Sequence, residues 1–161
     1  MSYKSKRTIA SLGAGILLLI AYLVYASGSH APAQEDIRGW ATLILAFIAI
    51  SVGVLIVIQI LFHIGYSIGI AVKEKLTEDT DDKEVERIVA SAMVEDEMDK
   101  LIALKSTHAG YVCAGLGFVA ALTALALGKP IVAALHILAG AAFLGSFVEG
   151  CISIYLYERG I

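Results

Sequence analysis

KEKLTEDTDDKEVERIVASAMVEDEMDKLIALK, residues 73–105, is the one strongly charged stretch of this 161-residue chain. It holds 11 acidic and 6 basic side chains, more than half of all the charged residues. The sequence on both sides is apolar, and 58% of all residues are hydrophobic. In lipid only a helix satisfies its own backbone hydrogen bonds along a single segment, so uncharged runs of about 18 residues predict membrane-spanning helices. The chain therefore consists of two apolar halves joined by one charged segment.

The apolar runs predict an all-α integral membrane bundle of four transmembrane helices, arranged as two antiparallel hairpins within a single domain, 1–161. A basic start before an apolar run could also be a secretory signal, but the length of the first run favours a retained helix. The expected helices cover residues 8–27, 40–66 (with a continuation toward 73), 106–127 and 130–157.

Within the charged stretch, residues 73–83 are expected to form the connector and residues 83–105 a cytoplasmic amphipathic extension that precedes the third helix. The apolar positions of the extension recur with helical spacing, which predicts one apolar face. These positions are Val85, Ile88, Val89, Ala92 and Met93. Two arrangements remain open: a continuous helix that enters the membrane, or a helix on the membrane surface with a kink near Glu95.

Small residues recur along the two helices of the second half. In the third helix they are Gly110, Ala114, Gly117, Ala121 and Ala124, and in the fourth Ala134, Ala141 and Gly145, followed on the same face by Glu149. Such faces allow helix backbones to approach closely in lipid. Residues 128–130, Gly-Lys-Pro, predict a tight turn between the two helices. We therefore expect the two faces to meet each other or a second copy of the chain.

The distribution of Lys and Arg predicts the orientation. If both termini are cytoplasmic, ten basic residues lie inside and two outside. The inner ones are Lys4, Lys6, Arg7, the six of residues 73–105 and Arg159, and the outer ones are Arg38 and Lys129. We expect a multi-pass protein of a bacterial or archaeal cell membrane, with the charged segment in the cytoplasm.

Ionisable groups inside a span are costly when unpaired and are candidates for function. Glu149 is the only acid within an expected span. It could serve as a proton or cation relay, or as a polar packing residue bonded to a neighbouring helix. His63, His108 and Tyr111 are expected in the same, cytoplasmic leaflet, so these four residues are the intramembrane polar candidates.

Two histidines and a carboxylate could bind a metal ion, and a histidine pair could hold a haem. His63 and His108 have no histidine partner at helical spacing, and Cys113 and Cys151 form no C-x-x-C pair. We therefore expect no cofactor. Motifs of nucleophilic, zinc-dependent or nucleotide-dependent enzymes are absent from the sequence, as are basic patches with interleaved aromatics, so neither an enzyme nor a nucleic-acid-binding protein is expected.

Residues 95–111, EDEMDKLIALKSTHAGY, resemble a group of small bacterial four-helix membrane proteins of unknown function. The matching positions are Asp96, Glu97, Asp99, Leu101, Ile102, Lys105 and Tyr111, and later Glu149, Tyr155, Tyr157, Arg159 and Gly160. Met98 and His108 stand where that group has arginines, which puts in doubt any pairing of arginine with the acids. The resemblance covers the second half of the chain. It implies a membrane protein, sometimes encoded beside a small helix-turn-helix regulator, and no established activity.

Three functional hypotheses follow. The first is a non-enzymatic, self-associating membrane protein whose acidic cytoplasmic helix docks a protein partner through Glu95, Asp96, Glu97 and Asp99. The second is a small oligomeric transporter or channel, coupled to protons or ions, with Glu149 as the coupling group. The third is metal or haem binding at His63 and His108.

Overall fold

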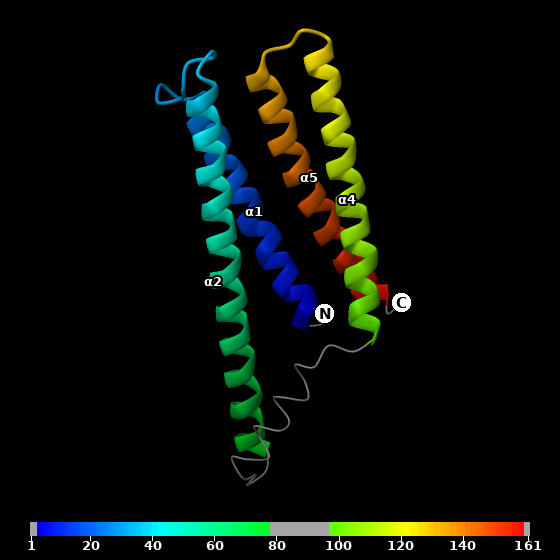
Figure 1. Ribbon diagram of the computed structural model, residues 1–161. Coiled ribbons are helices and arrows are strands. Elements are labelled where there is room, and N and C mark those ends of the chain that lie inside the picture. The colour runs from blue at the N-terminus through cyan, green and yellow to red at the C-terminus, as the bar shows by residue number, and fades with distance from the viewer. Residues whose placement is uncertain (1–2, 78–96, 160–161) are drawn as a thin grey trace.

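The computed structural model describes residues 3–77 and 97–159, and all of the regular structure in these ranges is helical. The helices are α1 (Tyr3–Ser27), α2 (Ile37–Thr77), α4 (Glu97–Ala126) and α5 (Ile131–Arg159), as Figure 1 shows. Each of the four is long and apolar enough to cross a membrane. The predicted all-α class and the four apolar helices are thus confirmed.

The helices extend beyond the apolar runs that predicted them. α1 begins at Tyr3 rather than at residue 8, and α2 runs from Ile37 to Thr77 rather than from 40 to 66 or 73. Straight-chain polar residues such as Lys, Glu and Gln are good helix formers, so a helix need not end where an apolar run ends. α4 already begins within the acidic cluster, at Glu97. The amphipathic pattern of residues 83–93, with Glu95, Asp96 and the expected kink, lies outside the described residues.

α4 ends in a tight turn that returns the chain along α5. Gly128 has a φ of +75°, a left-handed conformation that glycine adopts without steric cost. The Gly128 amide donates to the Leu125 carbonyl and the Lys129 amide to the Ala124 carbonyl, both at 3.0 Å. This is the Schellman arrangement, which satisfies the last free carbonyls of a helix. α5 then begins directly after Pro130, which cannot donate a backbone hydrogen bond.

Small residues hold α4 and α5 together within one chain. A Cβ atom at Gly117 would overlap that of Ala141, and one at Gly145 would lie 2.9 Å from the Gly110 carbonyl oxygen. The two backbones thus touch where glycine removes the side chain. The predicted stripe needs one correction: Ala114 is exposed and Ala124 is half-buried, because the buried line runs instead through Ile102, Ser106, Gly110, Gly117 and Ala121.

Larger side chains and a capped loop shape the α1–α2 pair. The Asp36 carboxylate accepts a hydrogen bond from the Gly39 amide at 2.8 Å, which caps the start of α2. Trp40 follows and is only 6% exposed. Its indole N–H donates to the Ala33 carbonyl at 3.0 Å. The ring of Trp40 contacts His136 of α5, at 4.7 Å between centroids, and so joins the two helix pairs at this end.

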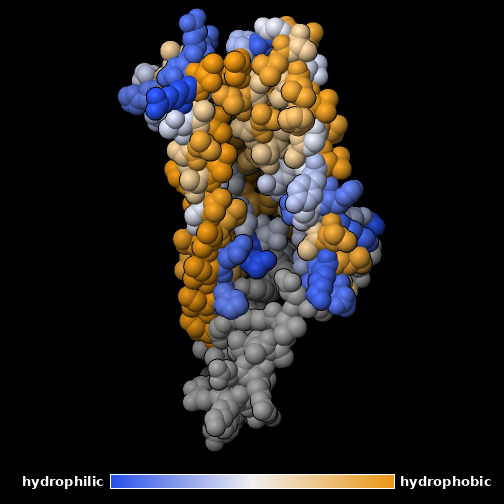
Figure 2. Space-filling view, in the orientation of Figure 1, coloured by the Kyte–Doolittle hydropathy of each residue, from blue (hydrophilic) through white to orange (hydrophobic). Residues whose placement is uncertain are grey.

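The bundle is open on one side. α1 contacts α2 and α5, α2 also contacts α5, and the described part of α4 contacts α5 alone. α2 and α4 therefore do not meet, and Figure 2 shows a hollow between α2 and the α4–α5 pair. The surface above is mainly apolar, whereas hydrophilic side chains gather in the lower part of this hollow, near the start of α1 in Figure 1.

Candidate functional site

Glu149 lies on α5 and is turned toward α4. Its Oε1 accepts a hydrogen bond from the Thr107 hydroxyl at 2.7 Å, and both side chains are half-buried. Gly110 makes room for the carboxyl group, since a Cβ atom there would lie 3.1 Å from Oε2. No hydrogen bond to Oε2 is formed by any described residue. The Glu149 carboxyl thus occupies a notch between α4 and α5, with Oε1 bonded to Thr107 and Oε2 beside Gly110.

A second polar group ties the helix ends together near the chain termini. The Tyr157 hydroxyl donates to the Asp99 carboxylate at 3.1 Å, which joins the end of α5 to the start of α4. The fully buried Ser5 hydroxyl of α1 donates to Glu158 at 3.2 Å. These bonds bring three helices together at the end where the charged segment enters α4.

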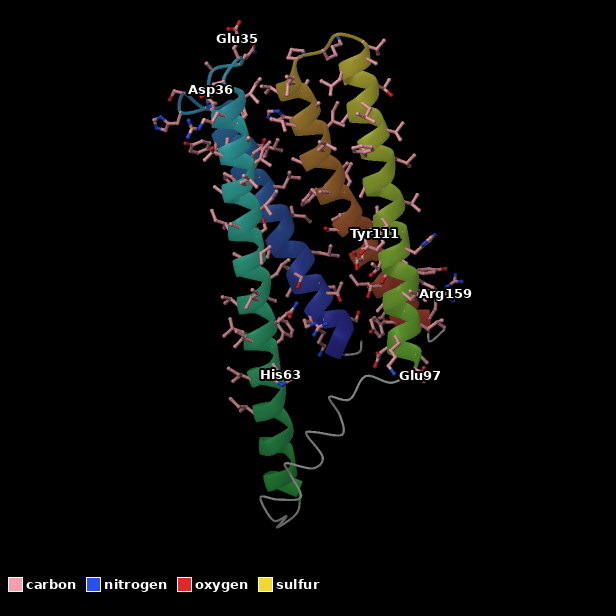
Figure 3. The ribbon with its side chains drawn as sticks, viewed as in Figure 1. Glu35, Asp36, His63, Glu97, Tyr111 and Arg159 are labelled. Carbon is pink, nitrogen blue, oxygen red and sulfur yellow. The ribbon has the colours of Figure 1, made fainter. Side chains whose placement is uncertain are left out.

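The acidic start of α4 also carries a side chain that is directed to solvent. Glu97 is 91% exposed and pairs with Lys100 at 2.9 Å, one turn along the same helix. Figure 3 shows Glu97 at the lower end of α4, with Arg159 at the neighbouring end of α5. Of the four predicted partner-binding acids, Asp99 is therefore bonded within the fold and Glu97 is accessible. Glu95 and Asp96 are outside the described residues.

The two histidines predicted near Glu149 occupy helices that do not contact each other. His63 lies on α2 and His108 on α4, and both side chains are exposed. Tyr111, three residues after His108, is 73% exposed on the surface of α4 (Figure 3). In residues 3–77 and 97–159, no three His, Cys, Asp or Glu side chains come close enough to share a metal ion. The structure brings together Glu149 and Thr107.

Trp40 of α2 and His136 of α5 are in contact, with 4.7 Å between their ring centroids. Phe47 and Tyr22 extend the cluster, with 5.3 Å between their ring centroids. Since a carbonyl oxygen only accepts, the 2.8 Å contact of His136 Nδ1 with the Val132 carbonyl assigns the proton to Nδ1. The buried Tyr22 hydroxyl has no hydrogen-bond partner among the described residues.

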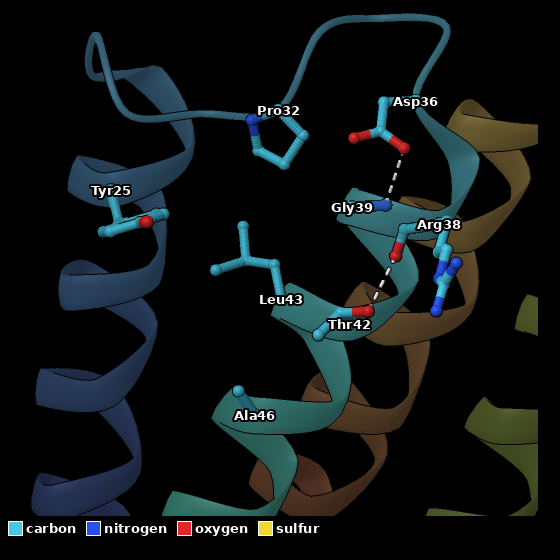
Figure 4. A pocket seen from close by; sticks show the side chains of 8 residues that line it. All are labelled: Tyr25, Pro32, Asp36, Arg38, Gly39, Thr42, Leu43 and Ala46. Atoms are coloured by element: carbon cyan, nitrogen blue, oxygen red, sulfur yellow. Dashed lines mark hydrogen bonds between the residues drawn. The ribbon is translucent and has the colours of Figure 1, made fainter.

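Two open cavities mark the surface of the α1–α2 pair. One, of about 480 Å³, lies beside the loop that joins the helices, and Figure 4 shows its lining. Two of its polar side chains form hydrogen bonds within α2: Asp36 caps the helix, and the Thr42 hydroxyl donates to the Arg38 carbonyl at 2.8 Å. The other, of about 300 Å³, lies at the opposite end of the pair, between the start of α1 and the middle of α2. Arg7, Gln59 and His63 contribute its polar lining.

The arrangement offers three kinds of chemistry: a carboxyl group held inside a helix pair, an acidic helix start fixed by hydrogen bonds, and a cavity with a cationic wall. Thr107 and Gly110 lie one turn apart on α4, where the first donates a hydrogen bond to Glu149 and the second leaves room for its carboxyl group. This pair was the sequence signal for the partner of Glu149. Comparison with known protein families, with curated proteins and with solved structures finds no match to this chain.

Proposed function

We propose that this protein is a non-enzymatic, multi-pass protein of a bacterial or archaeal cell membrane that self-associates and docks a cytoplasmic protein on the acidic start of α4. The four apolar helices would form two antiparallel hairpins with both termini in the cytoplasm, in agreement with the distribution of Lys and Arg. The resemblance of residues 95–111 to small bacterial four-helix membrane proteins supports the same assignment.

One observation carries the docking proposal: the start of α4 is fixed, while its outer carboxylate, paired with Lys100 one turn along, is exposed to solvent. Tyr157 holds Asp99 at 3.1 Å, so the first turn of α4 is tied to the end of α5. Glu97, two residues earlier, is 91% exposed. A carboxylate on a rigid support binds a cationic partner with little loss of conformational entropy, and complementary charge also speeds the encounter. The expected partner is a protein with a basic surface.

A photo-crosslinking amino acid placed at residue 97 tests docking in intact cells. We expect an adduct with another protein that disappears when Glu95 and Asp96 are changed to Gln and Asn. The matched control is the same probe at Lys129, an exposed position at the opposite end of α4. Equal adducts from both positions, or an adduct that persists after the acids are neutralised, would reject docking at the acidic start.

Self-association is supported by exposed small positions, where a second helix can approach closely. Gly115 of α4 is exposed and a Cβ atom there would meet nothing within 4 Å. In a chain without native cysteines, Gly115→Cys is expected to form a disulfide between copies in the membrane. Ala120→Cys, exposed on another side of the same helix, is the control. Disulfide formation at neither position, together with a monomer mass in lipid nanodiscs, would reject self-association.

A second candidate function is proton- or cation-coupled transport, and the notch at Glu149 favours it. Thr107 bonds one carboxyl oxygen at 2.7 Å, and the other oxygen accepts no hydrogen bond from the described residues. A carboxyl group that is held in place inside a membrane span is a candidate to exchange a proton or a cation. In vesicles with the purified protein, we expect a proton or monovalent-cation flux that Glu149→Gln abolishes and Thr107→Val reduces. No flux in the unmodified protein, or equal flux in Glu149→Gln, rejects transport.

A further inference from the structure

The smaller cavity lies beside the basic start of α1. Arg7 directly precedes the apolar run of this helix, and His63 lies near the end of the second expected span, residues 40–66. Gln59, Ile60 and Ile64 complete the lining. In a bilayer, this is the level of the lipid head groups and the first carbons of the acyl chains.

Arg7 brings a half-buried positive charge to this cavity. No carboxylate or other acceptor among the described side chains, those of residues 5–65, 68–69 and 97–159, forms an ion pair or hydrogen bond with its guanidinium. Glu158 and Asp99, acids near the same end of the molecule, have hydrogen bonds with Ser5 and Tyr157. A charge at the edge of the hydrocarbon core is unfavourable without a counter-charge. Among the described side chains the Arg7 guanidinium has no counter-charge, so an anionic ligand would stabilise it.

The residues that line the smaller cavity favour one kind of anion. A guanidinium group binds a phosphate group with two parallel hydrogen bonds, and the Gln59 amide supplies a further donor. Ile60 and Ile64 provide an apolar wall beside these donors. Figure 2 shows the same change of character, with hydrophilic side chains at the lower end of the hollow and apolar surface above them. The cavity thus matches a ligand with a phosphate at one end and a hydrocarbon chain at the other.

We infer that this cavity, with Arg7 and Gln59 as its donors and Ile60 and Ile64 as its apolar wall, binds the head group of an anionic phospholipid. A cavity of about 300 Å³ is large enough for a glycerophosphate group, with the acyl chains continuing along the open hollow between α2 and α4. Free inorganic phosphate shares the anionic chemistry but makes no use of the apolar wall. The site rests on the proposed membrane insertion, but not on docking or self-association.

Lipid binding can be measured as thermal stabilisation of the purified full-length protein in detergent micelles. The chain is titrated with phosphatidylglycerol, with phosphatidylcholine or with inorganic phosphate, and helix loss is followed by circular dichroism. Both lipids carry a phosphate, but only phosphatidylglycerol has a net negative charge, so we expect it to be preferred about tenfold in apparent affinity. Arg7→Gln is expected to remove this preference. Lys6→Gln, which removes the same charge from the adjacent exposed residue, is expected to retain it.

Each other outcome overturns the inference. If Arg7→Gln and Lys6→Gln reduced the preference for phosphatidylglycerol equally, the lipid would be attracted by surface charge in general and not by this cavity. Stabilisation by inorganic phosphate at the same concentrations would mean an anion site without a lipid. If Arg7→Gln does not insert into membranes, Arg7→Lys and Lys6→Arg replace the pair, because both keep the charge. Arg7→Lys replaces the planar guanidinium and its two parallel donors, so this variant alone is expected to weaken phosphatidylglycerol binding severalfold.

Discussion

The two helix pairs of this protein are joined in opposite ways. α4 and α5 meet backbone to backbone through glycine and alanine, and a short turn at Gly128 connects them. α1 and α2 are connected by residues 28–36 and meet through aromatic rings at the end near this loop. Close backbone contact excludes lipid and distributes the interaction along both helices, whereas the aromatic cluster concentrates it at one end. The first pair is therefore expected to be the rigid part of the molecule.

The largest effect should come from filling the α4–α5 contact. Gly117→Val places a branched side chain where even a Cβ atom would overlap that of Ala141. The helices must separate, and we expect a loss of about 3 kcal/mol in the free energy of unfolding. Unfolding in mixed micelles with increasing SDS measures it. Gly115→Val, on the same helix in open space, is the control. A stable Gly117→Val variant would show that this contact is not close.

The contact between α1 and α5, which joins the two helix pairs, should tolerate a larger side chain better than the α4–α5 contact does. A Cβ atom at Gly150 would lie 2.6 Å from a methyl carbon of Leu12 on α1, but this is the flexible end of a side chain. Gly150→Val is therefore expected to cost about 2 kcal/mol in the same assay, less than the change at Gly117. Gly140→Val, also on α5 but without neighbours within 4 Å, should have little effect. A larger loss at Gly150 than at Gly117 would reverse the ranking of the two contacts.

Within the aromatic cluster, Trp40→Phe keeps a ring but removes the indole N–H that bonds the Ala33 carbonyl. The expected cost is about 1.5 kcal/mol, from the lost hydrogen bond and the smaller buried surface. The same SDS titration followed by circular dichroism measures this cost. Tyr111→Phe provides the control, because Tyr111 is 73% exposed. Equal midpoints for both variants would mean that the cluster adds no stability.

The smallest of these effects concerns the cap of α2. Asp36→Ala removes the carboxylate that accepts the Gly39 amide, and such a loss typically costs about 1 kcal/mol. Glu35→Ala removes the same charge from the neighbouring exposed position and should be neutral. Hydrogen exchange of the first amides of α2 provides a local readout. Faster exchange in both variants would assign the effect to charge rather than to the cap.

Much of the α4–α5 pair could be predicted from the sequence because its geometry follows from the turn. Thr107 and Glu149 are each 21 residues from Gly128, and Asp99 and Tyr157 are each 29 residues from it. Residues at equal distances from a tight turn face each other when two helices run side by side, since both rise by about 1.5 Å per residue. Counting outward from Gly128 would therefore have identified Thr107 as the partner of Glu149.

The arrangement of the two pairs could not be derived in this way. The loop of residues 28–36 does not set a register, so the contact of Trp40 with His136 depends on side-chain shape rather than on spacing. The open side between α2 and α4 and the cavity at Arg7 result from the same lateral packing. Hydropathy identifies helices that can span a membrane, but it does not identify which of their faces remain uncovered.

The length of α2 has a mechanical consequence. It is a single helix of 41 residues, about 60 Å long at 1.5 Å per residue. Its aromatic contacts through Trp40 and Phe47 lie within the first third of this length, on the side away from Thr77. A tilt of about 5° displaces one end of a helix of this length by about 5 Å relative to the other. Small changes of tilt that accommodate bilayer thickness would thus be amplified at Thr77, where the chain passes into its acidic segment.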